Sequence, residues 1–263
     1  MSWADRWWRI ALTVRIGGRE HRAANPWRIS LTTTWPRALF QCLFFTLLGR
    51  VVGGDDGAAY MFIGSLAIIV TLFTISELGD VPMRDRWSAA FYRLRLGRLP
   101  IPVVYTLRAW PMVVEGALMA AVCLLVVGVI TGQGGLVRSL LPVFPFYLVM
   151  VATSAATGLA TASVGLFGRN GADTLVNNIA IYLIIATSGA LIPLGRVPWI
   201  EAVGTVLPLR NGLEAIRNRL IGEPWGGPLL HEVAVGLGWF LVAVLSYAVL
   251  TRRVRRTDHD KVT

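Results

Sequence analysis

The chain has 263 residues, of which 55% are hydrophobic and only 15% are charged. Soluble domains carry about 25% charged residues, so this composition excludes an ordinary soluble protein and indicates one whose surface faces lipid. The net charge is +10, and the arginines stand between apolar stretches, which favours basic loops at a membrane surface over a nucleic-acid site.

Residues 1–34 form a basic N-terminal segment with an amphipathic pattern. Its apolar side chains fall on one helical face, at Trp3, Trp7, Ile10 and Val14. Arginines occupy the other faces, at Arg6, Arg9 and Arg15. Tryptophan and arginine together favour a helix that lies at the level of the lipid head groups, and the alternative is a flexible basic tail.

Six later segments are long and apolar enough to cross a bilayer, which takes about 20 helical residues. They are 35–53, 59–78, 104–130, 140–166, 175–194 and 230–250. The sequence therefore predicts an all-α integral membrane protein whose transmembrane domain covers residues 35–250. Near the start of the third segment, Arg108 and Glu115 are expected to reach the interface or to pair with each other.

Arginine placement predicts the orientation. The first 30 residues, the loop 79–103 and the tail 251–263 are rich in arginine, and six spans put all three on one side. Positively charged loops stay inside, so both termini and the loop 79–103 are expected to be cytoplasmic. An odd number of spans would separate the basic N-terminal segment from the basic tail.

The outer segment 195–228 carries charges of both signs that nearly cancel, and its apolar residues recur at helical spacing with a break at Pro208. This pattern predicts two short re-entrant helices that lie in or dip into the outer leaflet against the bundle.

Catalytic and metal-binding motifs are absent from the sequence. Lys261 is the single lysine, so a phosphate-binding loop of the GxxxxGK type cannot be formed. The histidines form no zinc-binding pair, and Cys42 and Cys123 stand within apolar stretches, as buried thiols do. Glu77 and Glu115 are the two carboxylates considered for a proton pathway, and both fall near span ends. The sequence thus predicts no catalytic residue and no metal site.

The small residues of segment 152–165 are typical of close helix packing, and this face could serve packing within the chain, a transport pathway or a subunit interface.

Residues 188–222 carry a pattern of prolines and glycines around two short helices. The pattern consists of Ser188, Gly189, Pro193, Pro198, Trp199, Pro208, Leu209, Ala215, Ile216, Arg217 and Gly222. It resembles the C-terminal signature of ABC-2-type transporter permeases, the transmembrane subunits of ABC exporters, and the chain is similar in size to permeases of daunorubicin-type drug exporters. The resemblance implies six spans, an interfacial N-terminal helix, re-entrant helices before the last span, and a place in a bacterial plasma membrane.

The resemblance also implies a function and partners. A permease of this kind moves an amphipathic or hydrophobic substrate outward, such as a drug, a natural product or a lipid-linked molecule, and polysaccharide export uses the same architecture. It has no cofactor of its own, because ATP and Mg²⁺ bind a separate P-loop ATPase subunit. The expected partners are that ATPase, a second permease in a homodimer or heterodimer, and membrane lipid, without nucleic acid.

By the same resemblance, the ATPase docks on a coupling segment at residues 85–96. The residues expected to contact it are Asp85, Arg86, Trp87, Phe91 and Tyr92. Aromatic side chains are costly to leave in water, which favours a protein contact over an ordinary solvated basic loop. The family's acidic-basic pair is usually followed by a glycine, which this segment lacks.

Two other classes remain open from the sequence. An integral-membrane enzyme of lipid or cell-wall metabolism would need paired carboxylates or histidines at the membrane face. A secondary transporter would be expected to show intramembrane charges or an inverted repeat. Neither pattern is visible in the sequence.

Overall fold

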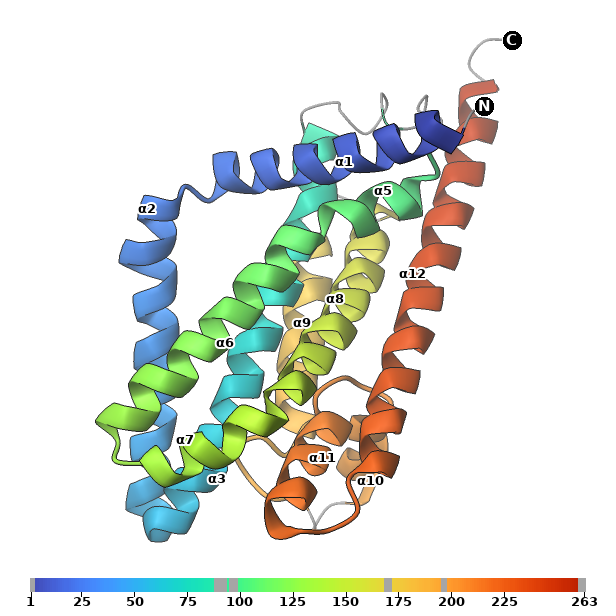
Figure 1. Cartoon of the computed structure of the whole chain (residues 1–263). Helices are drawn as coiled ribbons and strands as arrows, with labels where there is room; N and C mark the ends of the chain where they lie inside the picture. The colour runs from blue at the N-terminus through green and yellow to red at the C-terminus, as the bar shows by residue number, and fades with distance from the viewer. Residues whose placement is uncertain (1–2, 88–93, 95–98, 168–171, 195–197, 260–263) are drawn as a thin grey trace.

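The computed structural model describes residues 3–87, 94, 99–167, 172–194 and 198–259, and these residues form helices and short turns without a strand (Figure 1). The α-helices in chain order are α1 (Trp3–Ala24), α2 (Trp27–Ile29), α3 (Trp35–Trp87), α5 (Ile101–Arg108), α6 (Trp110–Ile130), α7 (Gly134–Leu140), α8 (Phe144–Phe167), α9 (Ala172–Thr187), α10 (Pro198–Thr205), α11 (Arg210–Ile221) and α12 (Gly226–His259). A π-helical turn, Ser30–Thr34, joins α2 to α3, and a 3-10 turn, Leu141–Val143, joins α7 to α8.

The long helices form a bundle with two distinct ends (Figure 1). Helix α1 lies across one end, beside α5 and the start of α6, and we call this the α1 end. The opposite end carries α7, α10 and α11, and we call it the α11 end. The basic N-terminal segment therefore does form a helix, and that helix runs along the end of the bundle rather than through it.

Helix α3 is a hairpin of two arms, residues 35–52 and 55–87. The chain reverses at Gly53 and Gly54, where Gly54 has a φ of 64° that disfavours any residue with a Cβ. Next to the turn, the two arms are in backbone contact at Gly49 and Gly57. A Cβ added to either glycine would overlap the carbonyl oxygen of the other. The predicted segments 35–53 and 59–78 thus lie on opposite arms.

Four helical stretches in the described residues are long and apolar enough to cross a membrane. They are Trp27–Pro82, Ile101–Ile130, Gly134–Ser163 and Gly226–Leu250, and the first includes both arms of α3. A shorter apolar helix covers Leu175–Thr187. The chain is accordingly a multi-pass, all-helical membrane protein.

Two helices end at residues other than the predicted span limits. The second arm of α3 continues nine residues past 78, to Trp87, so Asp85 belongs to a helix and not to a loop. Helix α9 ends at Thr187 instead of 194, because Gly189 adopts a φ of 68° and turns the chain back over the bundle.

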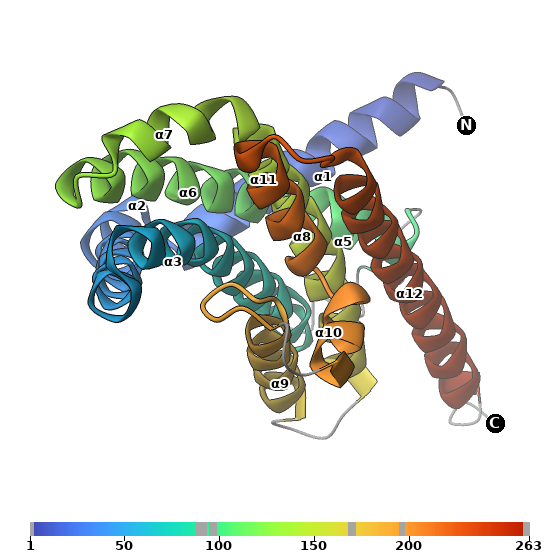
Figure 2. The ribbon, with the colours of Figure 1, turned by 90° about the horizontal axis from the view of Figure 1, so that it is seen from below.

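Helix α8 is the central element of the bundle and packs against α3, α6, α9, α11 and α12 (Figure 2). Its small residues allow this. A Cβ on Gly158 would lie 3.2 Å from the Cα of Ile75, and Ser154 shares a 3.0 Å hydrogen bond with Thr71. In the described chain, the small-residue segment 152–165 therefore serves packing between helices of the same chain.

Candidate functional site

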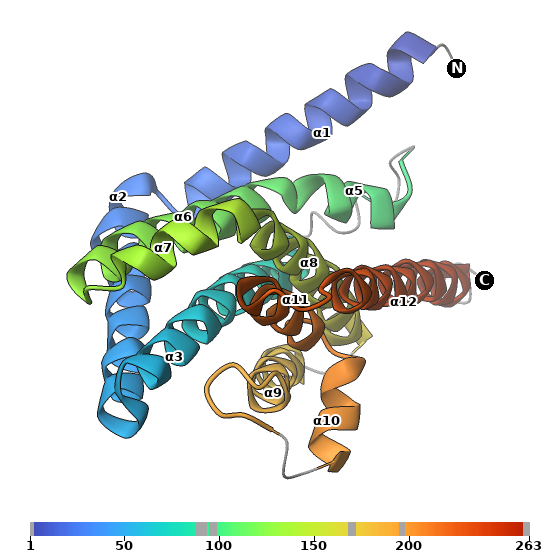
Figure 3. The ribbon, with the colours of Figure 1, turned by 60° about the horizontal axis from the view of Figure 1, so that its bottom comes forward.

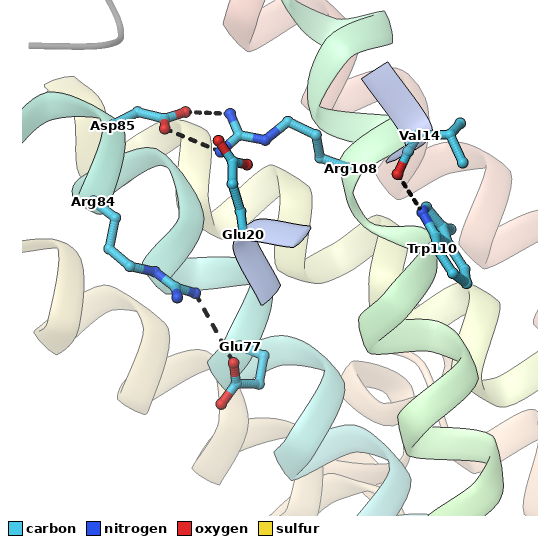
Figure 4. Close-up of polar contacts among 7 residues, drawn as sticks. All are labelled: Val14, Glu20, Glu77, Arg84, Asp85, Arg108 and Trp110. Atoms are coloured by element: carbon cyan, nitrogen blue, oxygen red, sulfur yellow. Dashed lines mark hydrogen bonds and ion pairs between the residues drawn. The ribbon is translucent and has the colours of Figure 1, made fainter. Parts of the chain in front are cut away.

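At the α1 end, Arg108 joins three helices that are far apart in sequence (Figure 4). Its guanidinium donates to the two carboxylate oxygens of Asp85, at 2.6 and 3.0 Å, and lies 2.5 Å from a carboxylate oxygen of Glu20. Arg108 ends α5, Asp85 lies in the last turn of α3, and Glu20 lies on α1. We call these three residues the clamp.

The clamp is mostly shielded from solvent. Arg108 and Asp85 are 7% and 4% exposed, whereas the side chain of Glu20 is about half exposed. A planar guanidinium matches a carboxylate at both oxygens, so the Arg108–Asp85 pair fixes direction as well as distance. The expected pairing of Arg108 with Glu115 is therefore wrong, because α1 and α3 supply closer carboxylates.

A second row of contacts ties α1 to the bundle. The Nε2 atom of His21 lies 2.5 Å from Glu115, and the side-chain amide of Asn25 donates to Glu77 at 2.6 Å. Glu77 also lies 3.9 Å from the guanidinium of Arg84, as Figure 4 shows. Both carboxylates that the sequence analysis considered for proton transport are thus bonded to α1.

Helix α1 also meets the elbow between α5 and α6. The indole of Trp110 donates to the carbonyl of Val14 at 2.9 Å (Figure 4). Gly17 lies against the backbone of Arg108, where a Cβ would come within 2.9 Å of the Cα. Beside the clamp, a cavity of about 300 Å³ separates α1 from the ends of α3 and α5. These contacts tie α1 to the ends of α3 and α5 and to the start of α6.

The predicted coupling residues fall at or just beyond this junction. Asp85 points inward to Arg108, so its carboxylate is engaged within the chain. Arg86 and Trp87 complete the last turn of α3, and their side chains lie outside the described residues. Phe91 and Tyr92 also lie outside them. The contact of these residues with an ATPase stays a prediction.

At the α11 end, the predicted turn residues converge on Arg217. Its guanidinium donates to the carbonyls of Gly189 and Ala190, at 3.1 and 3.4 Å, and lies 3.7 Å above the ring of Tyr60. The Tyr60 hydroxyl donates to the same Gly189 carbonyl at 2.7 Å. Desolvation lowers the pKa of Arg217, but a guanidinium remains charged at any physiological pH.

The turn after α9 also approaches the second arm of α3 very closely. A Cβ on Gly64 would overlap the carbonyl oxygen of Ala190, so this position admits a glycine alone without a backbone shift. Ser188 closes the turn, because its hydroxyl accepts from the Ala190 amide at 3.1 Å. Ser188, Gly189 and Arg217, separated in the sequence, are therefore brought together.

The remaining members of the pattern end and begin helices. Pro198 is the first residue of α10, where its missing amide hydrogen costs nothing. Pro208 lies buried between α10 and α11, and Gly222 ends α11 with a φ of 81°. Pro193 lies in the exposed part of the turn after α9. These residues shape the two short helices, which pack against α8, α9 and α12 (Figure 3).

Sequence reasoning missed Glu232. This fully buried carboxylate, near the start of α12, accepts from the amides of Leu209 and Gly212 at 3.0 and 3.1 Å and from the Thr153 hydroxyl at 2.6 Å. It satisfies backbone donors at the N-terminal end of α11, where negative charge is favoured. One signal in the sequence could have indicated it. A carboxylate at the beginning of an apolar span is costly to bury unless other groups bond to it.

Metal ligation finds no support in the described residues, since no three His, Cys, Asp or Glu side chains gather there. Cys42 and Cys123 are free and buried, as predicted.

Comparison with known proteins gives consistent matches. The family model described as ABC-2 type transporter matches residues 18–221. The chain is 26% identical over 222 residues to Nodulation protein J of Sinorhizobium fredii, with 79% of each chain covered. It is 28% identical over 224 residues to the protein of the same name from Neorhizobium galegae, again with 79% of each covered. In Rhizobium leguminosarum bv. trifolii the identity is 28% over 222 residues, covering 80% of this chain and 79% of the relative.

Proposed function

The chain belongs to the ABC-2 type transporter family, and from this premise we propose that it is the permease subunit of an ATP-driven exporter. The observation that carries the proposal is the family match, which begins inside α1 and ends with α11 and so includes both candidate sites. The sequence cannot form a phosphate-binding loop, so ATP and Mg²⁺ would bind a separate ATPase subunit.

The proposed orientation places the α1 end in the cytoplasm. Helix α1, the last turn of α3 and the last turns of α12 carry arginines at this end, as cytoplasmic segments do. The arms of α3, then α6, α8, α9 and α12, would make six crossings of a bacterial plasma membrane. Helices α10 and α11 would lie in the outer leaflet as re-entrant elements.

Coupling would run from the ATPase through the segment 85–96 into the clamp. An ATPase that pushes on the end of α3 would move Asp85, and the bidentate pair would carry that motion to Arg108 at the α5–α6 elbow. Glu20 would transmit it to α1. Two permeases, identical or different, would line the path of an amphipathic or hydrophobic cargo such as a drug, a natural product or a lipid-linked molecule.

The decisive experiment is affinity purification of the tagged chain from its native host in mild detergent, with a known ABC complex as control. We expect a P-loop ATPase in a one-to-one ratio, and a second permease would establish a heterodimer. A chain that purifies without an ATPase, while the control complex stays intact, would contradict the proposal.

The coupling proposal has its own test. The double variant Arg86→Glu with Phe91→Ala alters the coupling segment 85–96 and leaves the three clamp residues in place, and we expect it to weaken ATPase binding. Asp85→Asn alters the clamp alone, and we expect the ATPase to bind but transport to fall. Normal transport in both variants would remove the coupling assignment.

A further inference from the structure

A groove of about 220 Å³ runs between the two arms of α3 near the α1 end. Five polar side chains line it, from Thr34, Arg37, Gln41, Ser76 and Glu77. Its apolar wall is formed mainly by Ile69, Leu72 and Phe73. The groove is separate from the clamp, from the cavity beside it and from the turn that holds Arg217.

Most of the polar groups in the groove have no partner. In the described part of the chain, the side chains of Thr34, Arg37, Gln41 and Ser76 make no hydrogen bond and no ion pair. Other hydroxyls on the same helices do bond locally, as Thr46 does to the carbonyl of Cys42 at 2.7 Å. Arg37 is exposed and the other three are half-buried, so all four can reach a partner from outside the chain.

The uncompensated charge of the groove is positive. Glu77 accepts a hydrogen bond from Asn25 and lies 3.9 Å from the guanidinium of Arg84, so its charge is opposed within the chain. The guanidinium of Arg37 is exposed and has no carboxylate against it among the described residues. An anion is therefore the ligand that the groove complements.

Polar and apolar groups are separated along the groove. Arg37 stands about 3 Å, and Gln41 about 9 Å, along the first arm from its start at Trp35, at 1.5 Å per residue. On the antiparallel second arm, Ser76 lies near the α1 end, with Phe73 one turn and Ile69 two turns deeper. The residues nearest the α1 end are polar, and those deeper in the groove are apolar except for Gln41, so the groove is divided as the head group and chain of a lipid are.

We propose that this groove binds an anionic amphiphile, with a phosphate-type head group on Arg37 and Gln41 and an acyl chain along Ile69, Leu72 and Phe73. The placement of the groove in the cytoplasmic leaflet rests on the proposed function. A bilayer phospholipid and a phosphate-bearing cargo present the same chemistry to these residues, so both could fill the groove.

Binding is tested by native mass spectrometry of the purified chain in detergent, with any subunit that co-purifies. The sample is titrated with dioleoyl phosphatidylglycerol or with dioleoylglycerol, which lacks the phosphate. We expect Arg37→Gln to weaken phosphatidylglycerol binding by roughly tenfold or more, because a charge-assisted bidentate contact is lost. Arg37→Lys keeps the charge and should weaken it less. Dioleoylglycerol binding should not change.

Arg28→Gln is the matched control, because Arg28 is an exposed arginine outside the groove. It should leave phosphatidylglycerol binding unchanged. If Gln41→Leu binds as the parent does, and Arg37→Gln binds no worse than Arg28→Gln, the groove is not the site.

The source of the amphiphile is decided in proteoliposomes that contain the complex and fluorescent phosphatidylglycerol. ATP-driven movement of the label that Arg37→Gln slows assigns a cargo site. Arg37-dependent binding without such movement assigns a resident bilayer lipid. The purification described under the proposed function fails or succeeds independently, because binding is measured on the chain whether or not an ATPase accompanies it.

Discussion

The two ends of the bundle are held together by different physical means. At the α1 end, long charged side chains reach between helices, and the clamp joins residues 20, 85 and 108. At the α11 end, the turn after α9 approaches α3 so closely that Gly64 lies on the Ala190 backbone, and the side chains of Arg217 and Glu232 bond backbone groups. Charged side chains can exchange partners, whereas a glycine packed against a backbone admits one arrangement. We therefore expect the clamp to rearrange more easily than the contact between Gly64 and Ala190.

The largest expected effect is that of Gly64→Val, which would break the rigid end. A side chain there overlaps the Ala190 carbonyl, and neither α3 nor the turn after α9 can move away without losing its contacts. We expect little or no monodisperse protein in size-exclusion chromatography. Gly238→Val is the control, because nothing lies within 4 Å of its Cβ position, and its elution should match the parent.

Next in size is Arg108→Leu, which leaves Asp85 buried and without its main partner. Breaking a buried ion pair costs about 3–5 kcal/mol, and we expect a clearly lower unfolding midpoint in detergent. The double variant Asp85→Leu with Arg108→Leu removes both charges and should recover most of the loss. A double variant as unstable as the single one would show that packing, not charge, holds this junction.

Glu232→Ala tests how much the buried carboxylate stabilises the α11 end. It leaves the amides of Leu209 and Gly212 without an acceptor, and we expect a loss of about 2–3 kcal/mol in thermal or denaturant unfolding. Leu209 has a φ of 88°, a strained value for a residue with a side chain, which its bond to Glu232 helps to hold. His231→Ala, at the exposed neighbouring position, should change stability by less than about 0.5 kcal/mol.

The smallest effect is expected for Glu20→Gln. This carboxylate is half exposed, so its contact with Arg108 is screened by solvent and worth about 0–1 kcal/mol. The difference from the parent should shrink further in 1 M salt, where the Debye length is about 3 Å. A loss as large as that of Arg108→Leu would mean that α1 is held mainly through Glu20.

Much of the fold could be predicted because hydrophobicity and helix signals are local. The apolar segments, the amphipathic N-terminal segment and the short segments around Pro208 all form helices in the structure. The residues at which helices end were less predictable. The sequence does not show that α9 ends at Thr187, because the stretch to 194 remains apolar and the turn depends on the backbone of Gly189.

The candidate site was only partly predictable. The proline and glycine pattern pointed to the α11 end, and the structure brings Ser188, Gly189 and Arg217 together there. At the α1 end, the sequence marked Asp85 and Arg108 as charged residues near span ends but paired neither correctly. The closest carboxylate to Arg108 along the sequence is Glu115, yet Glu115 faces His21.

The sequence by itself determined the class of this protein, because an apolar stretch long enough to cross a bilayer has few alternatives to a membrane-embedded helix. It also determined that no nucleotide-binding loop is present, since that motif needs a lysine in its proper place. Tertiary structure decided which charges meet. The partners of Arg108, Glu115 and Glu232 depend on how helices distant in sequence pack against one another. The spacing of residues along one helix does not predict that packing.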